Sequence, residues 1–151
     1  MDIHLSQNFL SAYVHHHKYY LDAWRTKGLS WNWGAALFGE AWFAFRKMYV
    51  FAAIIYSVNL LLGFVLGVTG LDDATLNGIY ILLALLQRVL FGLSANFIYY
   101  FSAVKKIKKA HGKHATLDLD ETRKLGGTSV LGVVVVVLVN LCFRLLDRFL
   151  A

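Results

Sequence analysis

The sequence predicts an all-α integral membrane protein with about three transmembrane helices, an N-terminal interfacial helix and a re-entrant or tilted aromatic helix. Hydrophobic residues make up 58% of its 151 residues, whereas soluble chains contain roughly 45–50%. The excess lies in long uncharged blocks, and a soluble chain of this length would have too little polar surface to cover them. Basic residues flank these blocks, where they indicate membrane topology rather than a nucleic-acid-binding face. We therefore expect one membrane domain overall and no nucleic-acid partner.

The N-terminal segment, residues 1–28, is predicted to form an amphipathic interfacial helix. Apolar and aromatic side chains recur at helical spacing between residues 4 and 24, and Gly28 supplies a stop. Its tyrosines and Trp24 suit the headgroup zone of a membrane. Two arrangements are open: the helix lies on the inner membrane surface, or it packs against a partner protein.

The next segment, residues 29–47, is predicted to contact the membrane through its aromatic side chains. It carries Asn32 and Glu40 within a largely apolar run. A run this short with a central carboxylate is a poor spanning helix, because a crossing takes about 20 apolar residues. We expect a re-entrant or tilted helix that returns at Arg46 and Lys47.

The remaining residues, 48–151, are predicted to contain three transmembrane helices. Residues 48–71 are uncharged and would extend about 36 Å as a helix, enough to cross a hydrocarbon core of about 30 Å. Residues 74–104 contain a single charge and exceed one crossing, so we expect their first turns to lie along the outer interface. Residues 125–143 are just long enough to span, and Asp118 resembles the start of a capping box, so this helix is expected to begin in the preceding loop.

Basic residues are distributed unevenly around these spans. Twelve of the 15 Lys and Arg residues precede residue 48 or lie within residues 105–124. The turn at residues 72–73 has none, and the C-terminal tail has two. Under the positive-inside rule, this difference predicts an N-terminus in the cytoplasm and a C-terminus outside.

A lysine cluster ends the second predicted span: Lys105, Lys106, Lys108 and Lys109. As topology signals, these residues need no further role. They are also candidate contacts for anionic lipid headgroups, at about 1 kcal/mol for each basic residue near the membrane surface. The two roles are compatible.

The most distinctive residues of the chain lie in two blocks. The first block contains Asn32, Trp33, Ala35, Gly39, Trp42, Arg46, Lys47, Met48 and Tyr49, and the second contains Gly92, Asn96 and Tyr99. Together they resemble the signature of a family of small bacterial membrane proteins, catalogued as domain of unknown function 2628. The resemblance covers roughly residues 20–110. It implies a bacterial inner membrane location and a general architecture, but no reaction.

Two positions depart from the pattern of that family. Glu40 stands where the family usually has proline, and Phe45 stands where tyrosine is common. Proline would fix a bend before Trp42, whereas glutamate permits a continuous helix and introduces a charge.

The charged residues Arg88 and Glu40 are candidates for an intramembrane role. A charge at the centre of a span costs about 2.5–3.5 kcal/mol, so it usually faces a bundle interior or water. Arg88 is therefore expected to pair with Glu40, or to reach outward to the headgroups or to acidic residues such as Asp73 and Asp147. A transport or proton role for Arg88 is the competing interpretation.

Three asparagines also lie within the predicted spans: Asn59, Asn96 and Asn140. We expect them to form hydrogen bonds between helices, worth about 0.6 kcal/mol each. The spacing of Gly63 and Gly67 would let two helices approach closely, so a second copy of the chain is one candidate partner.

The sequence contains no recognisable catalytic or cofactor motif. His15, His16 and His17 would point in three directions on a helix rather than converge on one metal. We therefore expect a non-enzymatic inner-membrane accessory, scaffold or lipid- or partner-interacting protein, without a metal or other cofactor. The alternative is a subunit of a small oligomeric transporter or channel that uses Arg88 and Glu40. A membrane enzyme acting on lipid would need a polar cluster near one interface, which the sequence does not assemble.

Overall fold

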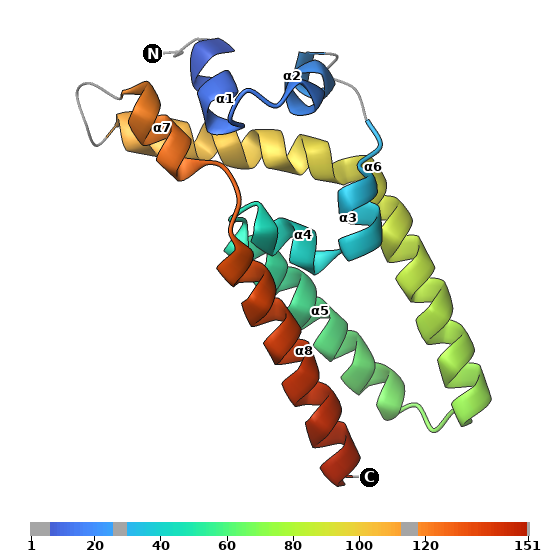
Figure 1. Cartoon of the computed structure of the whole chain (residues 1–151). Coiled ribbons are helices and arrows are strands. Elements are labelled where there is room, and N and C mark those ends of the chain that lie inside the picture. Colours follow the sequence, from blue (N-terminus) through green and yellow to red (C-terminus); the bar gives the residue numbers. More distant parts are fainter. Residues whose placement is uncertain (1–6, 26–29, 113–117, 151) are drawn as a thin grey trace. The chain divides into compact units, whose positions relative to one another are not determined.

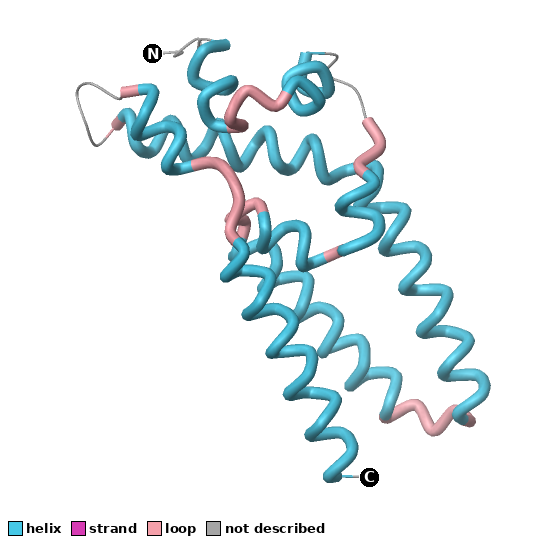
Figure 2. The backbone as a smooth tube through the Cα atoms, in the orientation of Figure 1, coloured by secondary structure: helices cyan, strands magenta, loops and turns pink. Residues whose placement is uncertain are grey.

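The computed structural model describes residues 7–25, 30–112 and 118–150, and these residues contain helices and loops but no strand (Figures 1 and 2). In order, the helices are α1 (Gln7–Tyr13), α2 (Lys18–Arg25), α3 (Trp33–Phe38), α4 (Glu40–Phe45), α5 (Tyr49–Gly67), α6 (Asp73–His111), α7 (Leu119–Leu125) and α8 (Val130–Leu150). Helices α5 and α6 and the stretch Leu119–Phe143, which includes most of α8, are long and apolar enough to cross a membrane. The predicted all-α class with three spanning helices is confirmed.

The chain forms two compact units. Unit 1 contains Met1–Asn32 and Leu93–Thr128, and unit 2 contains Trp33–Gly92 and Ser129–Ala151. The boundary runs through α6, so residues 93–111 of this helix belong to unit 1. This grouping differs from the predicted linear division, because the N-terminal helices pack with residues that lie far along the chain.

The N-terminal helix predicted between residues 4 and 24 is divided into α1 and α2 in the described residues. His15 and His16 have φ angles of 52° and 60°, in the left-handed region. The amide of His16 donates to the carbonyl of Ser11 at 2.8 Å, and that of His15 donates to Ala12 at 3.0 Å. These two bonds form a Schellman motif, which ends α1 without a glycine. Residues 4–6 and 26–28 of the predicted helix lie outside the described residues.

The core of unit 1 is built on one face of α6. Its buried residues recur every fourth position, as a helix face requires: Ala95, Tyr99, Ala103 and Ile107. Around Tyr99 lie the rings of Tyr13, Tyr20 and Trp24, with centroids 5.8, 5.2 and 5.4 Å away. Each such ring pair contributes about 0.5–1.5 kcal/mol beyond its buried area. Tyr13 and Tyr20, predicted to suit the headgroup zone, are therefore core residues.

Helix α7 packs against α1 within unit 1. Asp118 is its N-cap, and the side chain accepts a hydrogen bond from the amide of Leu119 at 2.6 Å. A helix start at Asp118 is thus confirmed, but α7 ends at Leu125 and the third spanning helix begins separately at Val130. The amide of Gly127 donates to the carbonyl of Tyr13 at 3.2 Å, and a Cβ on Gly126 would overlap that carbonyl. The end of α7 therefore lies directly on the end of α1.

In unit 2, helix α4 packs against both α5 and α8. Phe43 is fully buried, and its ring lies 5.9 Å from that of Phe51 in α5 and 5.3 Å from that of Phe91 in α6. On the other side, the amide of Ser129 donates to the carbonyl of Phe45 at 2.7 Å. A Cβ on Gly132 would lie 2.7 Å from the carbonyl oxygen of Ala44, so only glycine permits this approach of α8.

Helix α6 contains 39 residues, well beyond one crossing. Residues 73–92 lie in unit 2 and would extend about 30 Å. Residues 93–111 include the buried face that forms the core of unit 1. The placement of the first turns along the outer interface stays a prediction. At the start of α6, the Thr75 hydroxyl and amide donate to the Asp72 carboxylate at 2.7 and 3.0 Å. These bonds hold the pKa of Asp72 below its ordinary value, since they favour the charged form.

Candidate functional site

A single residue, Gly39, separates α3 from α4. Its φ and ψ angles are 54° and −128°, a conformation that residues with a Cβ rarely adopt. Glu40 was expected to permit a continuous helix, but the conformation of Gly39 breaks the helix without a proline. Glu40 is the first residue of α4, a position where both proline and acidic residues are favoured.

Arg88 lies at this break. Its Nη1 donates to the carbonyl oxygen of Leu37 at 2.7 Å. A Cβ on Gly39 would lie 2.9 Å from the same nitrogen, so the missing side chain makes room for the guanidinium. The last carbonyl groups of a helix lack partners within the helix and attract cations. Arg88 therefore caps the C-terminal end of α3.

The predicted pair between Arg88 and Glu40 is not formed in the described residues, since no ion pair or hydrogen bond joins the two side chains. Arg88 does not reach toward the outer turn either. It follows Asp73 by 15 residues, which is about 22 Å along a continuous helix. The side chain of Asp147, the other predicted partner, lies outside the described residues. Arg88 finds a backbone carbonyl instead of a carboxylate.

The two sequence blocks meet through a pair of buried asparagines in unit 1. Asn32 Nδ2 donates to Asn96 Oδ1 at 2.6 Å, and both residues are only 2% exposed. Asn96 Nδ2 donates to Tyr19 Oη at 3.0 Å and to Ser30 Oγ at 2.8 Å, while Trp24 Nε1 donates to the Asn96 carbonyl at 3.0 Å. The predicted helix-linking role is confirmed for Asn96, which joins the N-terminal segments to α6.

The other two asparagines differ in what they join. Gln87 Nε2 donates to Asn59 Oδ1 at 2.9 Å, so Asn59 links α5 to α6 as predicted. Asn140 Nδ2 instead donates to the carbonyl of Val136 in its own helix at 2.9 Å. The prediction of an interhelical bond is therefore wrong for Asn140. Gly63 and Gly67, the other predicted packing residues, have nothing within 4 Å of an added Cβ.

The basic end of the first block forms the turn between α4 and α5. Lys47 has a φ of 57°, its amide donates to Ala44 at 3.0 Å, and the amide of Met48 donates to Phe43 at 2.8 Å. This is a second Schellman motif with a non-glycine residue, and Met48 and Phe43, which stand at the two positions of its usual hydrophobic contact, are both buried. The predicted return at Arg46 and Lys47 is thus a helix C-cap. Arg46 is buried, with its guanidinium 5.5 Å from the ring centroid of Phe45.

The remaining residues of the first block divide into buried and exposed positions. Ala35 and Trp42 are buried in unit 2, where α3 and α4 pack together. Trp33 and Tyr49, at the first positions of α3 and α5, are exposed. Packing therefore explains the first pair, whereas the exposed rings suit a membrane–water interface.

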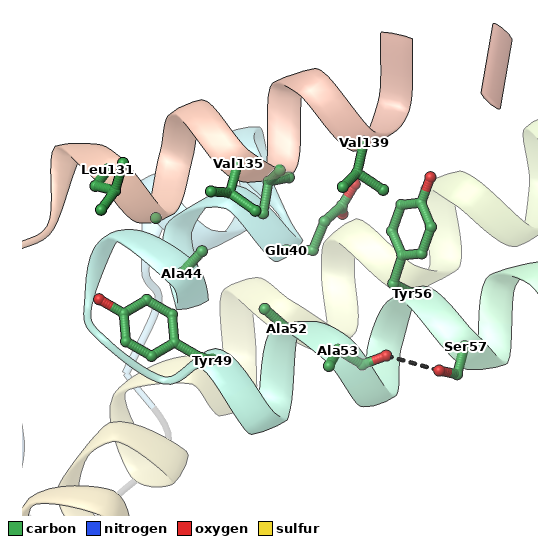
Figure 3. A pocket seen from close by; sticks show the side chains of 12 residues that line it. Glu40, Ala44, Tyr49, Ala52, Ala53, Tyr56, Ser57, Leu131, Val135 and Val139 are labelled. Atoms are coloured by element: carbon green, nitrogen blue, oxygen red, sulfur yellow. Dashed lines mark hydrogen bonds between the residues drawn. The ribbon is translucent and has the colours of Figure 1, made fainter. Parts of the chain in front are cut away.

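A cavity of about 650 Å³ lies between α4, α5 and α8 in unit 2 (Figure 3). Its walls are mostly apolar, with Ala44, Ala53 and Val135 among them. Glu40 reaches into the space between α5 and α8, on the side of Tyr56 and Val139. The carboxylate of Glu40 has no ion pair or hydrogen bond in the part of the chain that the structure describes. The cavity is an apolar groove with one unpaired carboxylate.

The histidine run lies where α1 meets α7 in unit 1. The Nε2 atom of His15 is 3.1 Å from the carbonyl of Arg123, and the Nε2 atom of His16 is 3.2 Å from Nη2 of Arg123. The Nδ1 atom of His16 is 2.7 Å from Ser11 Oγ. Among the described residues, no group of three or more His, Cys, Asp or Glu side chains is arranged to hold a metal ion. These two histidines instead contact groups that join α1 to α7.

The predicted lipid contacts lie on the part of α6 that belongs to unit 1. Lys105, Lys108 and Lys109 are exposed, and Lys106 is partly buried. Toward the N-terminus, the same helix exposes the rings of Phe97 and Phe101, whose centroids are 4.6 Å apart. Sequence hydropathy alone does not separate these exposed rings from the buried Tyr99, because all three fall in one apolar run.

Residues 10–105 match the sequence profile of a protein family described as "Protein of unknown function (DUF2628)". The chain is a member of the DUF2628 family. This match confirms the predicted resemblance and contains the Asn32–Asn96 pair, the Gly39 break and the Lys47 turn. Helices α7 and α8 lie beyond the matched residues of the DUF2628 domain. No curated protein and no solved structure matches the chain.

Proposed function

We propose that this DUF2628 protein is a non-enzymatic accessory protein of the bacterial inner membrane that binds anionic lipid headgroups on the cytoplasmic side. The observation that carries the proposal is the exposed stripe on residues 93–111 of α6. The stripe consists of Leu93, Phe97, Phe101, Lys105 and Lys108, and it is defined by exposure and helical spacing.

The stripe lies on the side of the helix opposite the unit 1 core. Leu93, Phe97 and Phe101 recur every fourth residue and are 37%, 52% and 54% exposed. Because a helix turns about 100° per residue, these positions face away from Tyr99 and Ala103. A solvent-exposed stripe of two phenylalanines would be unfavourable in water. An apolar patch next to lysines suits a helix at a membrane surface.

The lysines at the end of the stripe supply the preference for anionic lipid. Each contributes about 1 kcal/mol near an anionic surface, which is roughly a fivefold change in affinity. The positive-inside rule places the same lysines in the cytoplasm, where the leaflet carries negative lipid headgroups. The predicted topology, with the N-terminus inside and the C-terminus outside, supports this orientation.

The test is lipid retention by the full-length protein reconstituted in nanodiscs of equal phosphatidylglycerol and phosphatidylcholine. Native mass spectrometry measures which lipid stays bound after release. We expect a preference for phosphatidylglycerol that falls roughly fivefold with each lysine removed, and most in the triple variant Lys105→Gln, Lys108→Gln and Lys109→Gln. A matched control, Lys18→Gln with Arg25→Gln and Lys124→Gln, removes the same charge from exposed positions elsewhere in unit 1. Equal losses in the two triple variants, or no preference in the wild type, would contradict the proposal.

The alternative of an oligomeric transporter or channel subunit receives less support. It requires Arg88 and Glu40 to line a common path. Arg88 donates to the Leu37 carbonyl at the end of α3, whereas Glu40 lines the groove between α4, α5 and α8. A structural cap explains Arg88 without transport.

A further inference from the structure

We propose that the groove between α4, α5 and α8 binds a transmembrane helix of another membrane protein, and that this partner helix carries a Lys or Arg side chain that pairs with Glu40. The inference uses unit 2 alone and does not depend on the lysine stripe of unit 1.

The carboxylate of Glu40 has no partner among the described residues. Glu40 points into the groove between α5 and α8 (Figure 3), and no described residue forms an ion pair or hydrogen bond with it. The nearby cation Arg88 donates to the Leu37 carbonyl instead. Charged residues in a membrane are costly and usually pair within a bundle. A cation from outside the chain would complete this site.

The shape of the groove supports a helix as its occupant. Helix α4 packs on both α5 and α8 and stands between their first turns. The groove holds about 650 Å³ and includes small side chains of α5, namely Ala52, Ala53 and Ser57. In membranes, small residues allow the backbones of two helices to approach closely. Between Tyr49 and Tyr56, the small side chains of the α5 wall therefore allow the backbone of another helix to approach closely.

The depth of Glu40 argues against a lipid amine as the cation. Tyr49 is the first residue of α5, and its exposed ring suits the interface. Glu40 lies nearer to Tyr56 than to Tyr49 in Figure 3, and Tyr56 is about 10 Å further along the helix. A headgroup amine stays near the interface, whereas a Lys or Arg on a partner helix can be placed at this depth.

A second copy of the chain is the weaker candidate. A two-fold pair of grooves would present one Glu40 to another, and like charges repel. The basic residue within the predicted spans is Arg88, which already has the Leu37 carbonyl as acceptor. A different membrane protein therefore supplies the cation.

The test uses two synthetic transmembrane peptides of leucine and alanine, identical except for one Lys or Leu about 10 Å below the cytoplasmic end. Binding to the full-length protein is measured by energy transfer in nanodiscs of phosphatidylcholine. We expect the lysine peptide to bind at least tenfold more tightly than the leucine peptide. Glu40→Gln should abolish that difference, because the amide keeps the shape and removes the charge. Equal binding of the two peptides, or a difference that survives in Glu40→Gln, would overturn the proposal.

A second pair of variants tests the groove without touching Glu40. Ala53→Phe fills the groove, whereas Ile54→Phe adds the same ring at an adjacent residue of α5 that is 53% exposed and outside the groove. Only Ala53→Phe should lower binding of the lysine peptide, by tenfold or more, with circular dichroism unchanged in both. If both variants bind equally, the groove is not the site. If Ala53→Phe instead abolishes a homodimer, or if phosphatidylethanolamine displaces the peptide, the occupant is a second copy or a lipid and the proposal fails.

Discussion

At Gly39 two requirements meet in one residue. The backbone needs a conformation that residues with a Cβ rarely adopt, and the Arg88 guanidinium occupies the space where a Cβ would lie. The bond from Arg88 to Leu37 then satisfies a carbonyl that the break has released. The sequence identifies Arg88 as a charge in need of a partner, but it does not identify a backbone acceptor, because every residue carries one. Charge alone therefore predicts a carboxylate partner for Arg88.

Replacing Arg88 tests this cap. Arg88→Met leaves the Leu37 carbonyl without its donor, so the free energy of unfolding should fall by about 1–3 kcal/mol. Arg88→Lys keeps the charge near the end of α3 and should lose less. Denaturant unfolding of the purified protein in detergent measures both. If Arg88→Met folds as stably as the wild type and a transport activity is lost, the structural interpretation is wrong.

At the scale of the element, two helix breaks in this chain lack the usual glycine or proline. The sequence has no proline, and two breaks use non-glycine residues in the left-handed region, at His15–His16 and at Lys47. Because glycine, and less often asparagine, usually marks such turns, the sequence does not predict the division of α1 from α2. The return at Lys47 was predicted from its charge, and its cap geometry appears only in the structure. The predicted span at residues 74–104 also crosses the boundary between the two units, because a buried protein core and a lipid bilayer select the same apolar residues.

The Lys47 turn predicts a specific pattern of tolerance. A β-branched residue is strained in the left-handed region, so Lys47→Val should lower the free energy of unfolding by about 1–2 kcal/mol. Glycine takes that conformation freely, so the free energy of unfolding of Lys47→Gly should exceed that of Lys47→Val by at least about 1–2 kcal/mol. As a control, Lys108→Val places the same residue at an exposed helical position and should cost less than about 1 kcal/mol. Thermal unfolding monitored by circular dichroism ranks the variants, and an equal loss for both valine variants would rule out strain at this turn.

At the scale of the whole molecule, hydropathy and charge predicted the three spanning helices, and the first block of residues predicted the family. The grouping into two units was not predictable, because it depends on contacts such as Asn32–Asn96 between residues 64 positions apart. Glu40 was predicted as an intramembrane charge, yet its groove depends on α8, which lies beyond the matched family region. A sequence shows which side chains need partners, while folding decides which ones meet.

Topology is the property on which the proposed function rests, and cysteine labelling tests it directly. In a Cys142→Ser background, Asp73→Cys reports the start of α6, and Lys108→Cys reports the exposed stripe on residues 93–111 of α6. A membrane-impermeant maleimide is applied to bacterial spheroplasts before and after permeabilisation. We predict labelling of Asp73→Cys in intact spheroplasts and labelling of Lys108→Cys only after permeabilisation. Labelling of Lys108→Cys in intact spheroplasts would contradict a cytoplasmic lysine stripe and the membrane orientation proposed for the protein.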